Sequence, residues 1–491
     1  MAPSPPPTDL HFVLFPLMAQ GHLVPMVDIA RILAQRGATV TIITTPNDAN
    51  RIRPVISRAI EAKLKILLLE LQPRLAEAGL PEGCESFDQL PSFEYWKNLS
   101  AAIDLLEQPA EDLLRELSPP PDCIISDFLF PWTTDVARRF NIPRLVFNGP
   151  GCFFLLCMHV AISSNILGDT ESVNERVVLP GLPDRIEVTK LQITGSSKAV
   201  TKEDMNSWVR AVDAEKAAYG IVVHTFNELE PEYVKEYTRV KETKVWCIGP
   251  VSLCNKNGLD IAERGNKAAI NEHSCLNWLD EREPGSVLYV CLGSLARVSS
   301  KQAIELGLGL ESINRPFIWC IRNKTEEFET WLSQGFVDRV RDRGLIIHGW
   351  APQVLILSHQ AIGGFLTHCG WNSTLESVSA GVPMVTWPFF ADQFLNETFI
   401  VEILKIGVRI GVQIPVVYGE EDKVGVLVKK EDVKKAVECL MEEDEDGEER
   451  RKRVMELAKM AKIAMAEGGS SYQNVSSLIQ DITKTIEKLD I

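Results

Sequence analysis

Short apolar runs alternate with helical patterns along the first half of the chain. The first run spans His11 to Leu17, and between Met26 and Leu33 apolar residues recur at helical spacing. A Gln-Gly-His loop lies between these two segments. A second apolar run, Thr39 to Thr44, follows Gly37. A strand, loop, helix and strand in this order predict a parallel sheet with right-handed crossovers.

The same alternation recurs further along the chain and predicts a second sheet. In the first half, Cys123 to Ser126 and Gly220 to Thr225 are further strand candidates, and a helix is expected after Pro131. In the second half, the predicted strands are Ser286 to Leu292, Phe317 to Ile321, Leu345 to His348, Ile362 to Thr367 and Val382 to Thr386. We therefore predict an α/β fold with two Rossmann-like domains.

A polar stretch with little periodicity separates the two predicted sheets and indicates a linker. At 491 residues, the chain also exceeds the usual size of one hydrophobic core. We predict an N-terminal domain over residues 1–252, a linker over 253–274 and a C-terminal domain over 275–458. Helices over 459–491 are expected to pack back on the N-terminal domain.

The composition is that of a globular protein and argues against some partners. Hydrophobic residues make up 45% and charged residues 24% of the chain. The formal net charge of −16 would repel nucleic-acid phosphates and anionic lipid surfaces. A small anionic ligand remains possible, because helix ends, backbone amides and a few histidines supply a local positive field. We expect no nucleic-acid partner and no membrane insertion.

The cysteines indicate a reducing compartment. The 11 cysteines are scattered from Cys84 to Cys439 without a C-x-x-C pair, which is typical of reduced thiols in a cytoplasmic protein. The Pro-rich start, Pro3 to Pro7, lacks the basic region of a signal peptide. The most apolar later stretch, Cys152 to Ile166, is shorter than a bilayer span requires. We therefore expect a cytoplasmic location.

The densest motif spans Trp350 to Gln393, with the sequence WAPQVLILSHQAIGGFLTHCGWNSTLESVSAGVPMVTWPFFADQ. This segment resembles the signature box of the plant secondary-product UDP-dependent glycosyltransferases over its whole length. Further agreement comes from Gly21-His22, Ser126-Asp127, Leu179-Pro180-Gly181-Leu182-Pro183, Ile248-Gly249-Pro250 and Leu292-Gly293-Ser294. The resemblance implies two facing Rossmann-like domains with the active site in the interdomain cleft, the arrangement called GT-B.

The pattern inside the box independently favours a nucleotide site. Ile362 to Thr367 is a buried strand, and a tight loop from His368 to Ser373 leads into a helix. A helix N-terminus presents unpaired N–H groups and a partial positive charge, which suit a diphosphate. Glu376, one turn into the helix, is placed to accept hydrogen bonds from two ribose hydroxyls, as the acidic residue of a dinucleotide fold does.

The resemblance assigns further donor contacts. His368 and Ser373, with Ser294 and Asn372, are implied to bind the diphosphate, while Trp350 stacks on uracil and Gln353 lies near the ribose. The UDP-sugar pocket is completed by Ala351, Gly370 and Trp371. Taken alone, the tryptophans are more often core aromatics and Glu376 a solvent-facing helix residue, but their joint spacing reverses this balance.

The pair Asp392 and Gln393 resembles the sugar-contacting pair of the family. Neighbouring carboxylate and amide groups suit the adjacent hydroxyls of a hexose. Gln at the final position is the family pattern for glucose, and His there is associated with galactose. We therefore expect UDP-glucose as the donor, with UDP-galactose and UDP-glucuronate as the alternatives.

The candidate general base is His22, with Asp127 as its partner. His22 is expected in an exposed loop at the carboxyl end of the first sheet, where α/β domains place ligands. An alcohol is a weak nucleophile at neutral pH, and an imidazole titrates near the working pH. Asp127 on a neighbouring loop would hold the tautomer and stabilise the imidazolium. Direct attack on an α-linked donor then gives a β-glycoside with inversion.

No metal or other cofactor is expected, because a helix terminus and His368 can stabilise the leaving UDP. An alternative site is Asp444-Glu445-Asp446, a D-x-D spacing that some glycosyltransferases use to hold a divalent metal. The surrounding charge run, Glu442 to Arg453, is interpreted as a solvated loop between two helices. No neighbouring apolar strand would position its carboxylates.

The acceptor pocket is expected in the first domain, built from aromatic residues that could equally belong to its core. The candidates are Phe128, Phe130, Trp132, Phe153 and Phe154. The start of the chain, the Trp132 region and the Leu-Pro-Gly-Leu-Pro segment look most like family members that act on triterpenoids, steroids and flavonols.

The sequence therefore favours an inverting UDP-glucosyltransferase of plant secondary metabolism. It would transfer glucose to a hydroxyl or carboxyl group of a small lipophilic acceptor, and we expect it to act as a monomer. The rival hypotheses are a nucleotide-sugar epimerase or hydrolase of the same fold, and a catalytically silent protein that binds UDP-sugars or terpenoids. His22 and Asp127 argue against a silent protein.

Overall fold

The computed structural model describes residues 9–167, 174–196, 201–322, 325–417, 419–425 and 427–489, so the Pro-rich start lies outside the described residues. The strands of the first half are β1 (His11–Phe15), β2 (Thr39–Thr44), β3 (Ile66–Glu70), β4 (Cys123–Asp127), β5 (Arg144–Asn148), β6 (Arg176–Leu179), β7 (Ile186–Thr189), β8 (Gly220–Val223) and β9 (Lys244–Cys247). Those of the second half are β10 (Val287–Cys291), β11 (Phe317–Ile321), β12 (Gly344–His348), β13 (Ile362–Thr367), β14 (Met384–Thr386) and β15 (Gly407–Arg409).

Helices follow most of these strands. In the first half they are α1 (Gln20–Gln35), α2 (Pro46–Glu61), α3 (Trp96–Asp104), α4 (Glu107–Glu116), α5 (Thr133–Arg139), α6 (Cys152–Ser163), α7 (Lys190–Thr194), α8 (Lys202–Lys216), α9 (Pro231–Lys241) and α10 (Gly258–Ala262). In the second half they are α11 (Glu272–Asp280), α12 (Ser300–Ser312), α13 (Glu326–Trp331), α14 (Val337–Val340), α15 (Gln353–Leu357), α16 (Trp371–Ala380), α17 (Gln393–Thr398), α18 (Glu421–Val424), α19 (Lys430–Met441), α20 (Glu445–Met465) and α21 (Ser470–Leu489).

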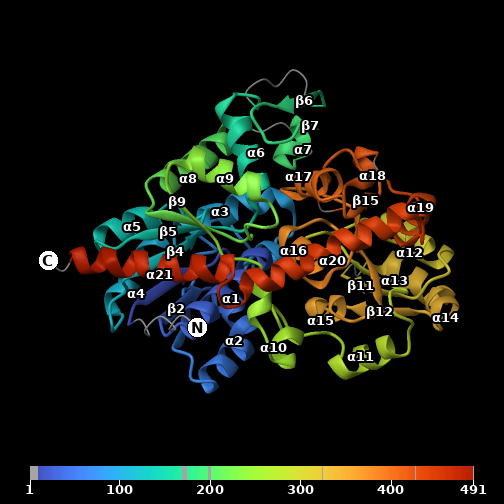
Figure 1. Cartoon of the computed structure of the whole chain (residues 1–491), viewed down its shortest axis with the longest axis horizontal. Helices are drawn as coiled ribbons and strands as arrows, with labels where there is room; N and C mark the ends of the chain where they lie inside the picture. Colours follow the sequence, from blue (N-terminus) through green and yellow to red (C-terminus); the bar gives the residue numbers. More distant parts are fainter. Residues whose placement is uncertain are drawn as a thin grey trace.

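Each half forms its own parallel sheet, and helices pack around both (Figure 1). The first sheet has the order β3-β2-β1-β4-β5-β8-β9, and the second has the order β12-β11-β10-β13-β14-β15. The antiparallel pair of β6 and β7 lies apart from them. These are two Rossmann-like α/β domains. The strand order brings together residues that are distant in sequence. β1 and β4 are neighbours, and so are β10 and β13, so residues at the carboxyl ends of each pair lie close together.

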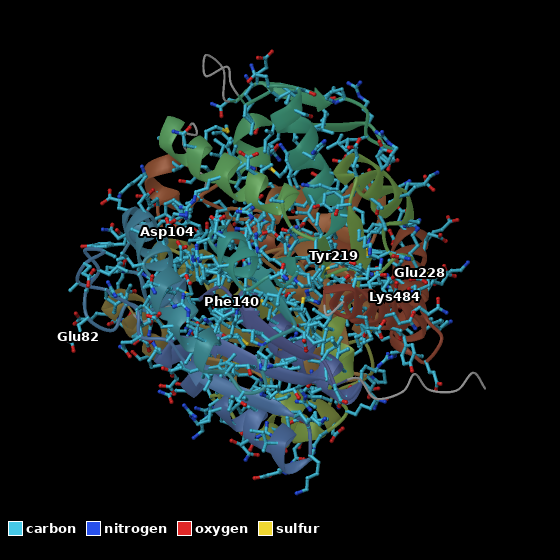
Figure 2. The ribbon with its side chains drawn as sticks, turned by 90° about the vertical axis from the view of Figure 1, so that its left-hand side faces the viewer. Glu82, Asp104, Phe140, Tyr219, Glu228 and Lys484 are labelled. Carbon is cyan, nitrogen blue, oxygen red and sulfur yellow. The ribbon has the colours of Figure 1, made fainter. Side chains whose placement is uncertain are left out.

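The last helix returns to the first domain. In Figure 1, α20 and α21 run across the molecule from the second sheet to the first. Val475, Leu478 and Ile482 of α21 are buried in the core cluster of the first sheet. The Thr485 hydroxyl donates to the Tyr219 hydroxyl over 2.9 Å, and Figure 2 shows Tyr219 close to the end of this helix. The N-terminal domain is therefore completed by the C-terminal end of the chain.

The charge run that we interpreted as a loop is mostly helical. From Glu445 onward it forms the first turns of α20, and Asp444 is the N-cap residue, whose carboxylate accepts from the Gly447 N–H over 2.7 Å. The acidic residues of the D-x-D spacing therefore lie at a helix N-terminus, where negative charge is favourable. In the described residues, no helix is both long and apolar enough to cross a membrane.

The predicted linker is folded onto the first domain. Its helix α10 carries Asp260, which accepts from Arg31 over 2.5 Å and from Arg58 over 2.7 Å. The linker is polar because its charges pair with α1 and α2, and this pairing fixes the position of the segment that follows, which contains Arg264.

Candidate active site

The loop between β13 and α16 is held by tight backbone contacts. Gly370 is the N-cap residue of α16, and the preceding Cys369 has a left-handed backbone with a φ of 64°. Such a conformation is uncommon for a residue with a side chain and marks a functional loop. The Asn396 amide donates to the Cys369 carbonyl over 2.9 Å and supports this turn from α17. The unpaired N–H groups of α16 are thereby presented at the carboxyl end of the second sheet.

His368 lies between two glycines of this loop region. A Cβ atom added to Gly293 or Gly370 would come within 2.4 Å of the His368 ring, so only glycine fits at either position. Burial, and after it the charge of Arg322, lowers the pKa of His368 to about 4. The imidazole is therefore neutral at physiological pH. It can donate one hydrogen bond to a diphosphate but cannot supply a full positive charge.

The residues predicted for the ribose form one hydrogen-bonded group. The Gln353 amide donates to the Glu376 carboxylate over 2.8 Å and to the Ser373 hydroxyl over 3.0 Å. The Tyr289 hydroxyl donates to the amide oxygen of Gln353 over 3.3 Å, which fixes the orientation of the amide. The structure thus brings Gln353, Ser373 and Glu376 together as expected from their spacing in the motif.

Arg264 of the linker connects this group to the first domain. Its guanidinium donates to Glu376 of α16 and, over 2.7 Å, to Asp28 of α1. All three side chains are more than nine-tenths buried. A buried charge is tolerated only when it is paired, so this ion-pair chain holds α1 and α16 in a fixed relation.

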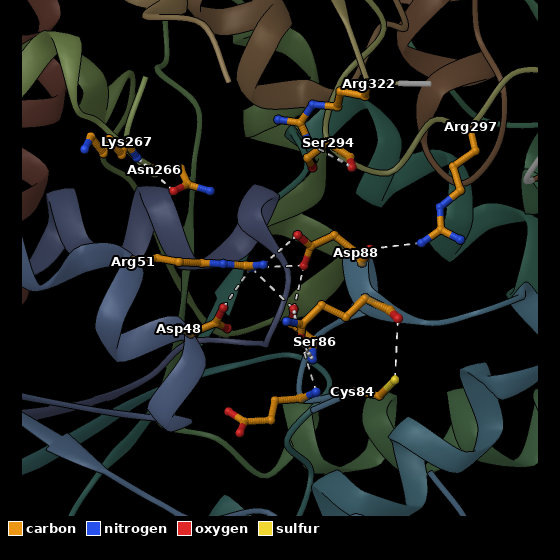
Figure 3. Close-up of polar contacts among 12 residues, drawn as sticks. Asp48, Arg51, Cys84, Ser86, Asp88, Asn266, Lys267, Ser294, Arg297 and Arg322 are labelled. Atoms are coloured by element: carbon orange, nitrogen blue, oxygen red, sulfur yellow. Dashed lines mark hydrogen bonds and ion pairs between the residues drawn. The ribbon is translucent and has the colours of Figure 1, made fainter. Parts of the chain in front are cut away.

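An arginine contacts the Trp350 ring, which is predicted to stack on uracil. The Arg322 guanidinium lies over this ring, 4.9 Å from its centroid, and donates to the Ser294 carbonyl over 3.1 Å (Figure 3). Gly265 packs against the Trp350 edge, and the Ala351 side chain is buried beside it. Residues assigned to uracil and to the diphosphate are therefore bridged by an arginine.

His22 and Asp127 form a direct pair. The Nδ1 atom of His22 lies 2.6 Å from an Asp127 carboxylate oxygen, and the other oxygen of Asp127 accepts from the Leu129 N–H over 3.0 Å. The His22 side chain is 30% exposed, whereas that of Asp127 is 1% exposed. His22 lies in the first turn of α1 and not in a loop as expected, because Ala19 already acts as the N-cap. Its ring is consequently held more firmly than a loop would hold it.

The charge distribution around His22 favours the imidazolium. Burial lowers the pKa of His22, but the charge and hydrogen bond of Asp127, with a smaller contribution from Asp392, raise it above the usual 6.5. Burial raises the pKa of Asp392 against its hydrogen bond from Asn396 and the charge of His22. His22 and Asp392 come from opposite domains, so the predicted base and the predicted sugar site face each other.

The predicted sugar pair has few free polar atoms. The Gln393 amide oxygen accepts from the Phe389 N–H over 2.8 Å and from the Phe390 N–H over 3.2 Å. One Asp392 oxygen accepts from the Asn396 amide over 2.7 Å. Within the part of the chain that the structure describes, the amide NH₂ of Gln393 and the second Asp392 oxygen are the groups of this pair that remain to contact a hexose.

Two predicted donor residues connect the domains in this structure. The Asn372 amide donates to the Gly21 carbonyl over 2.8 Å, directly beside His22. The Trp371 indole donates to the His224 carbonyl over 2.6 Å and packs against Gly151. The side chain of Trp371 is thus a domain contact, and what it offers a donor is its backbone at the start of α16.

The aromatic candidates for the acceptor pocket lie mainly in the core. Phe130, Trp132 and Phe153 are almost fully buried, and the Trp132 indole donates to a backbone carbonyl over 3.1 Å. Phe154 is also buried, while Phe128 is partly exposed and packs against Trp208 in a tilted arrangement with ring centroids 5.1 Å apart. Most of these residues therefore belong to the hydrophobic core, which is the alternative that the sequence left open.

Arg264, Arg322 and Asp28 were not identified from the sequence. Each is a single charged residue outside the signature box, and no spacing sets it apart from the other charged residues. Within the described residues, no group of three His, Cys, Asp or Glu side chains is arranged to hold a metal ion.

We predict that Arg264→Met lowers the free energy of unfolding by about 3–5 kcal/mol, because it leaves two buried carboxylates without their cation. Equilibrium urea unfolding measures this. The control is Arg53→Met, which breaks an exposed pair with Glu70 and should cost about 0–1 kcal/mol. Equal stability of the two variants would show that the ion-pair chain contributes nothing.

We predict that His22 titrates above 6.5 and that Asp127→Asn lowers its pKa, because the carboxylate is the main group that raises it. Two-dimensional NMR of ¹⁵N-labelled histidine follows both titrations. Since the pKa is raised on folding, the pair stabilises the fold fully below about pH 6.5, and this contribution is lost as the pH rises through the folded-state pKa. An unchanged pKa in the variant would contradict the pairing.

Comparisons with known proteins agree with this geometry. A family model described as "Glycosyltransferase, N-terminal domain" matches residues 9–253, and one described as "UDP-glucoronosyl and UDP-glucosyl transferase" matches residues 265–461. The chain is 81% identical over 484 residues to UDP-glycosyltransferase 73E1 of Stevia rebaudiana, covering 98% of each protein. It is 53% identical over 484 residues to UDP-glycosyltransferase 73C5 of Arabidopsis thaliana, again covering 98% of each.

Solved structures share the fold over nearly the whole chain. UGT73P12 of Glycyrrhiza uralensis, complexed with glycyrrhetinic acid 3-O-monoglucuronide, superposes with a TM-score of 0.88 at 35% identity, covering 98% of each chain. UGT2 of Phytolacca americana, complexed with UDP-2fluoro-glucose and pterostilbene, superposes with a TM-score of 0.77 at 27% identity, covering 96% of this chain and 100% of that one. The fold is therefore GT-B, and the chain belongs to the plant family 1 UDP-glycosyltransferases, within the UGT73 family.

Proposed function

We propose that this enzyme is an inverting UDP-glucosyltransferase that needs no metal and forms β-glucosides of small lipophilic plant metabolites. The observation that carries the proposal is the pair of His22 and Asp127 on the first domain, which faces Asp392 on the second. A base and a sugar-binding carboxylate at one place are what direct transfer to an acceptor hydroxyl requires.

In the proposed reaction, the Nε2 atom of His22 accepts the proton of the acceptor hydroxyl. The acceptor oxygen bonds to the anomeric carbon from the side opposite UDP, and the electron pair of the breaking bond leaves with the β-phosphate oxygen. Asp127 holds the Nδ1–H and stabilises the imidazolium. One displacement with no enzyme nucleophile inverts the anomeric centre.

The departing UDP is stabilised by the N-terminus of α16, with the neutral His368 and Ser373 as further hydrogen-bond donors. Glu376 and Gln353 take the ribose, and Trp350 takes the uracil. This division places the nucleotide on the second domain and the proton transfer on the first, so binding and chemistry are separable by mutation.

Triterpenoids, steroids and flavonoids are the acceptor classes that we propose. The two solved relatives hold glycyrrhetinic acid 3-O-monoglucuronide and pterostilbene, so related enzymes of this fold accommodate acceptors of different shapes. The glucuronide also makes UDP-glucuronate the second donor to consider. We propose that the enzyme acts in the cytoplasm.

The direct test is to incubate the purified enzyme with UDP-glucose and a panel of triterpenoid, steroid and flavonoid aglycones, and to identify the products by mass spectrometry. We expect glucosides with release of UDP. A silent binding protein would bind UDP without forming products, and a hydrolase or epimerase would consume UDP-glucose without an acceptor.

We predict that His22→Ala lowers glucoside formation by about 10²–10⁴-fold, because the general base is lost. UDP binding, measured by calorimetry, should stay close to that of the unmodified enzyme, because the nucleotide site lies on the other domain. The matched control is His273→Ala, since this histidine is 80% exposed on α11. Near-full turnover of the His22 variant would refute the assignment.

We predict that chelation by EDTA leaves the activity unchanged, because protein groups stabilise the leaving diphosphate. The assay compares metal-stripped enzyme with and without added Mn²⁺ or Mg²⁺. If activity is lost and either ion restores it, the metal-independent mechanism is wrong, and the carboxylates near Asp444 become the candidate metal site.

We predict that UDP-glucose is preferred over UDP-galactose and UDP-glucuronate in competition assays. An axial 4-hydroxyl loses its bond to Asp392 and leaves a buried oxygen unpaired, which costs roughly 1–3 kcal/mol. A glucuronate carboxylate would face Asp392 and be repelled. Gln393→His should reduce the preference over galactose. Better use of either competing donor by the unmodified enzyme would refute the donor assignment and leave the transferase assignment intact.

A further inference from the structure

The proposed nucleotide site binds a strongly anionic group, yet its assigned residues carry little positive charge. His368 is neutral because its pKa lies at about 4, and Ser294, Asn372 and Ser373 are uncharged. Glu376 adds a negative charge, and Arg264 is shared between Glu376 and Asp28, so it leaves no excess positive charge for a ligand. The partial charge of the α16 N-terminus is the main positive contribution from the assigned groups, and it is about half an elementary charge.

Arg322 is a full positive charge at this place. It directly follows β11, next to β10, whose loop carries Gly293 and Ser294. One of its N–H groups donates to the Ser294 carbonyl, and its guanidinium lies over the Trp350 ring. Within the described residues, these partners of Arg322 are a carbonyl group and an aromatic ring, and neither is an anion. A guanidinium has five N–H donors, so most of this fork is available to a ligand.

The surroundings of Arg322 show a positive local field. A hollow at the carboxyl ends of β10 and β11 is lined mainly by apolar side chains such as Leu306 and Trp319, and among the described residues Arg322 is the charged residue in its lining. Arg322 contributes to the lowered pKa of His368, after burial. It also helps to hold the pKa of the Cys291 thiol below its usual value, after the hydrogen bond from Cys320 and against burial. Both effects have the sign expected beside an unpaired cation.

We propose that Arg322 is a donor-binding residue whose guanidinium binds the diphosphate of the UDP-sugar and neutralises the charge that UDP gains as it leaves. The proposal rests on the proposed UDP-sugar site. When the bond between the anomeric carbon and the β-phosphate oxygen breaks, its electron pair stays on UDP, and Arg322 compensates that charge without a divalent cation. The acceptor proton goes to His22 on the other domain.

The chemistry of the ligand favours the diphosphate over the base as the partner of Arg322. Uracil is neutral and stacks on an aromatic face, whereas a diphosphate offers anionic oxygens that match the planar guanidinium fork. The Trp350 ring and the Ser294 carbonyl orient the guanidinium beforehand, so little side-chain entropy is lost when the donor binds. Arg322 thus lies between the proposed base site and the proposed phosphate site, and its positive charge is available to pair with the diphosphate.

The test compares the binding of uridine, UMP and UDP by calorimetry in the unmodified enzyme, Arg322→Gln and Arg322→Lys. The matched control is Arg297→Gln, which removes the same charge from the neighbouring loop. Figure 3 shows Arg297 directed at the first domain, where it donates to the backbone carbonyls of Asp88 over 3.0 Å and Pro91 over 3.3 Å.

We expect Arg322→Gln to bind uridine like the unmodified enzyme and to bind UDP about ten- to a hundredfold more weakly, as for a lost hydrogen bond between charged groups. Arg322→Lys should retain part of the UDP affinity, because it keeps the charge without the fork. Arg297→Gln should change neither the affinity for uridine nor the affinity for UDP. In assays with UDP-glucose, the kcat of Arg322→Gln should also fall, because the charge on UDP grows in the transition state.

Two results would overturn the role of Arg322. Equal weakening of uridine and UDP in Arg322→Gln would place the residue with the base, and unchanged UDP binding would exclude it from the donor site. An unmodified enzyme that binds none of the three ligands would instead refute the UDP-sugar site itself, so the failures of the two proposals are distinguishable.

Discussion

A buried guanidinium from the linker holds the two domains in register. Arg264 pairs with Asp28, which lies on the helix that carries His22, and with Glu376, which lies on the helix that carries Ser373. Neither carboxylate is stable in the interior without this cation. The helices α1 and α16 can therefore keep both ion pairs only in one relative position. A fixed distance between the proposed base and the donor is important for the reaction, because small misplacements of reacting groups lower the rate by large factors.

The charges of the site are separated by domain and by task. The charges of Asp127 and, less strongly, of Asp392 raise the pKa of His22, so in the proposed reaction they would stabilise the cation that forms when His22 accepts a proton. Asp127 is almost fully buried, and fixed charges act more strongly in such surroundings than in bulk solvent. On the second domain, the α16 N-terminus and Arg322 are the groups that we propose to stabilise the negative charge of the departing UDP. In the proposed reaction, the first domain therefore assists proton acceptance and the second domain assists the departure of UDP.

The signature box could be predicted well because its apolar strand, tight loop and helix follow one another in sequence, and β13 begins and ends as expected. The adjacency of His22 and Asp127 depends on β1 and β4 being neighbours, which local pattern alone does not determine. β5 was missed because its apolar run begins at Arg144, a charged residue that is buried through bonds to Ser126 and Thr134. Arg264 and Arg322 gain their meaning only from tertiary contacts, so no periodicity could identify them.

The proposed reaction is a single displacement between a base on one domain and a donor on the other. The most direct measurement is the anomeric configuration of the product, read by ¹H NMR from the coupling between the first two protons of the transferred sugar immediately after transfer from the α-linked donor. We expect a β-glycoside, with the large coupling of two axial protons. An α-glycoside would require a second displacement or a front-side attack, and would contradict the mechanism.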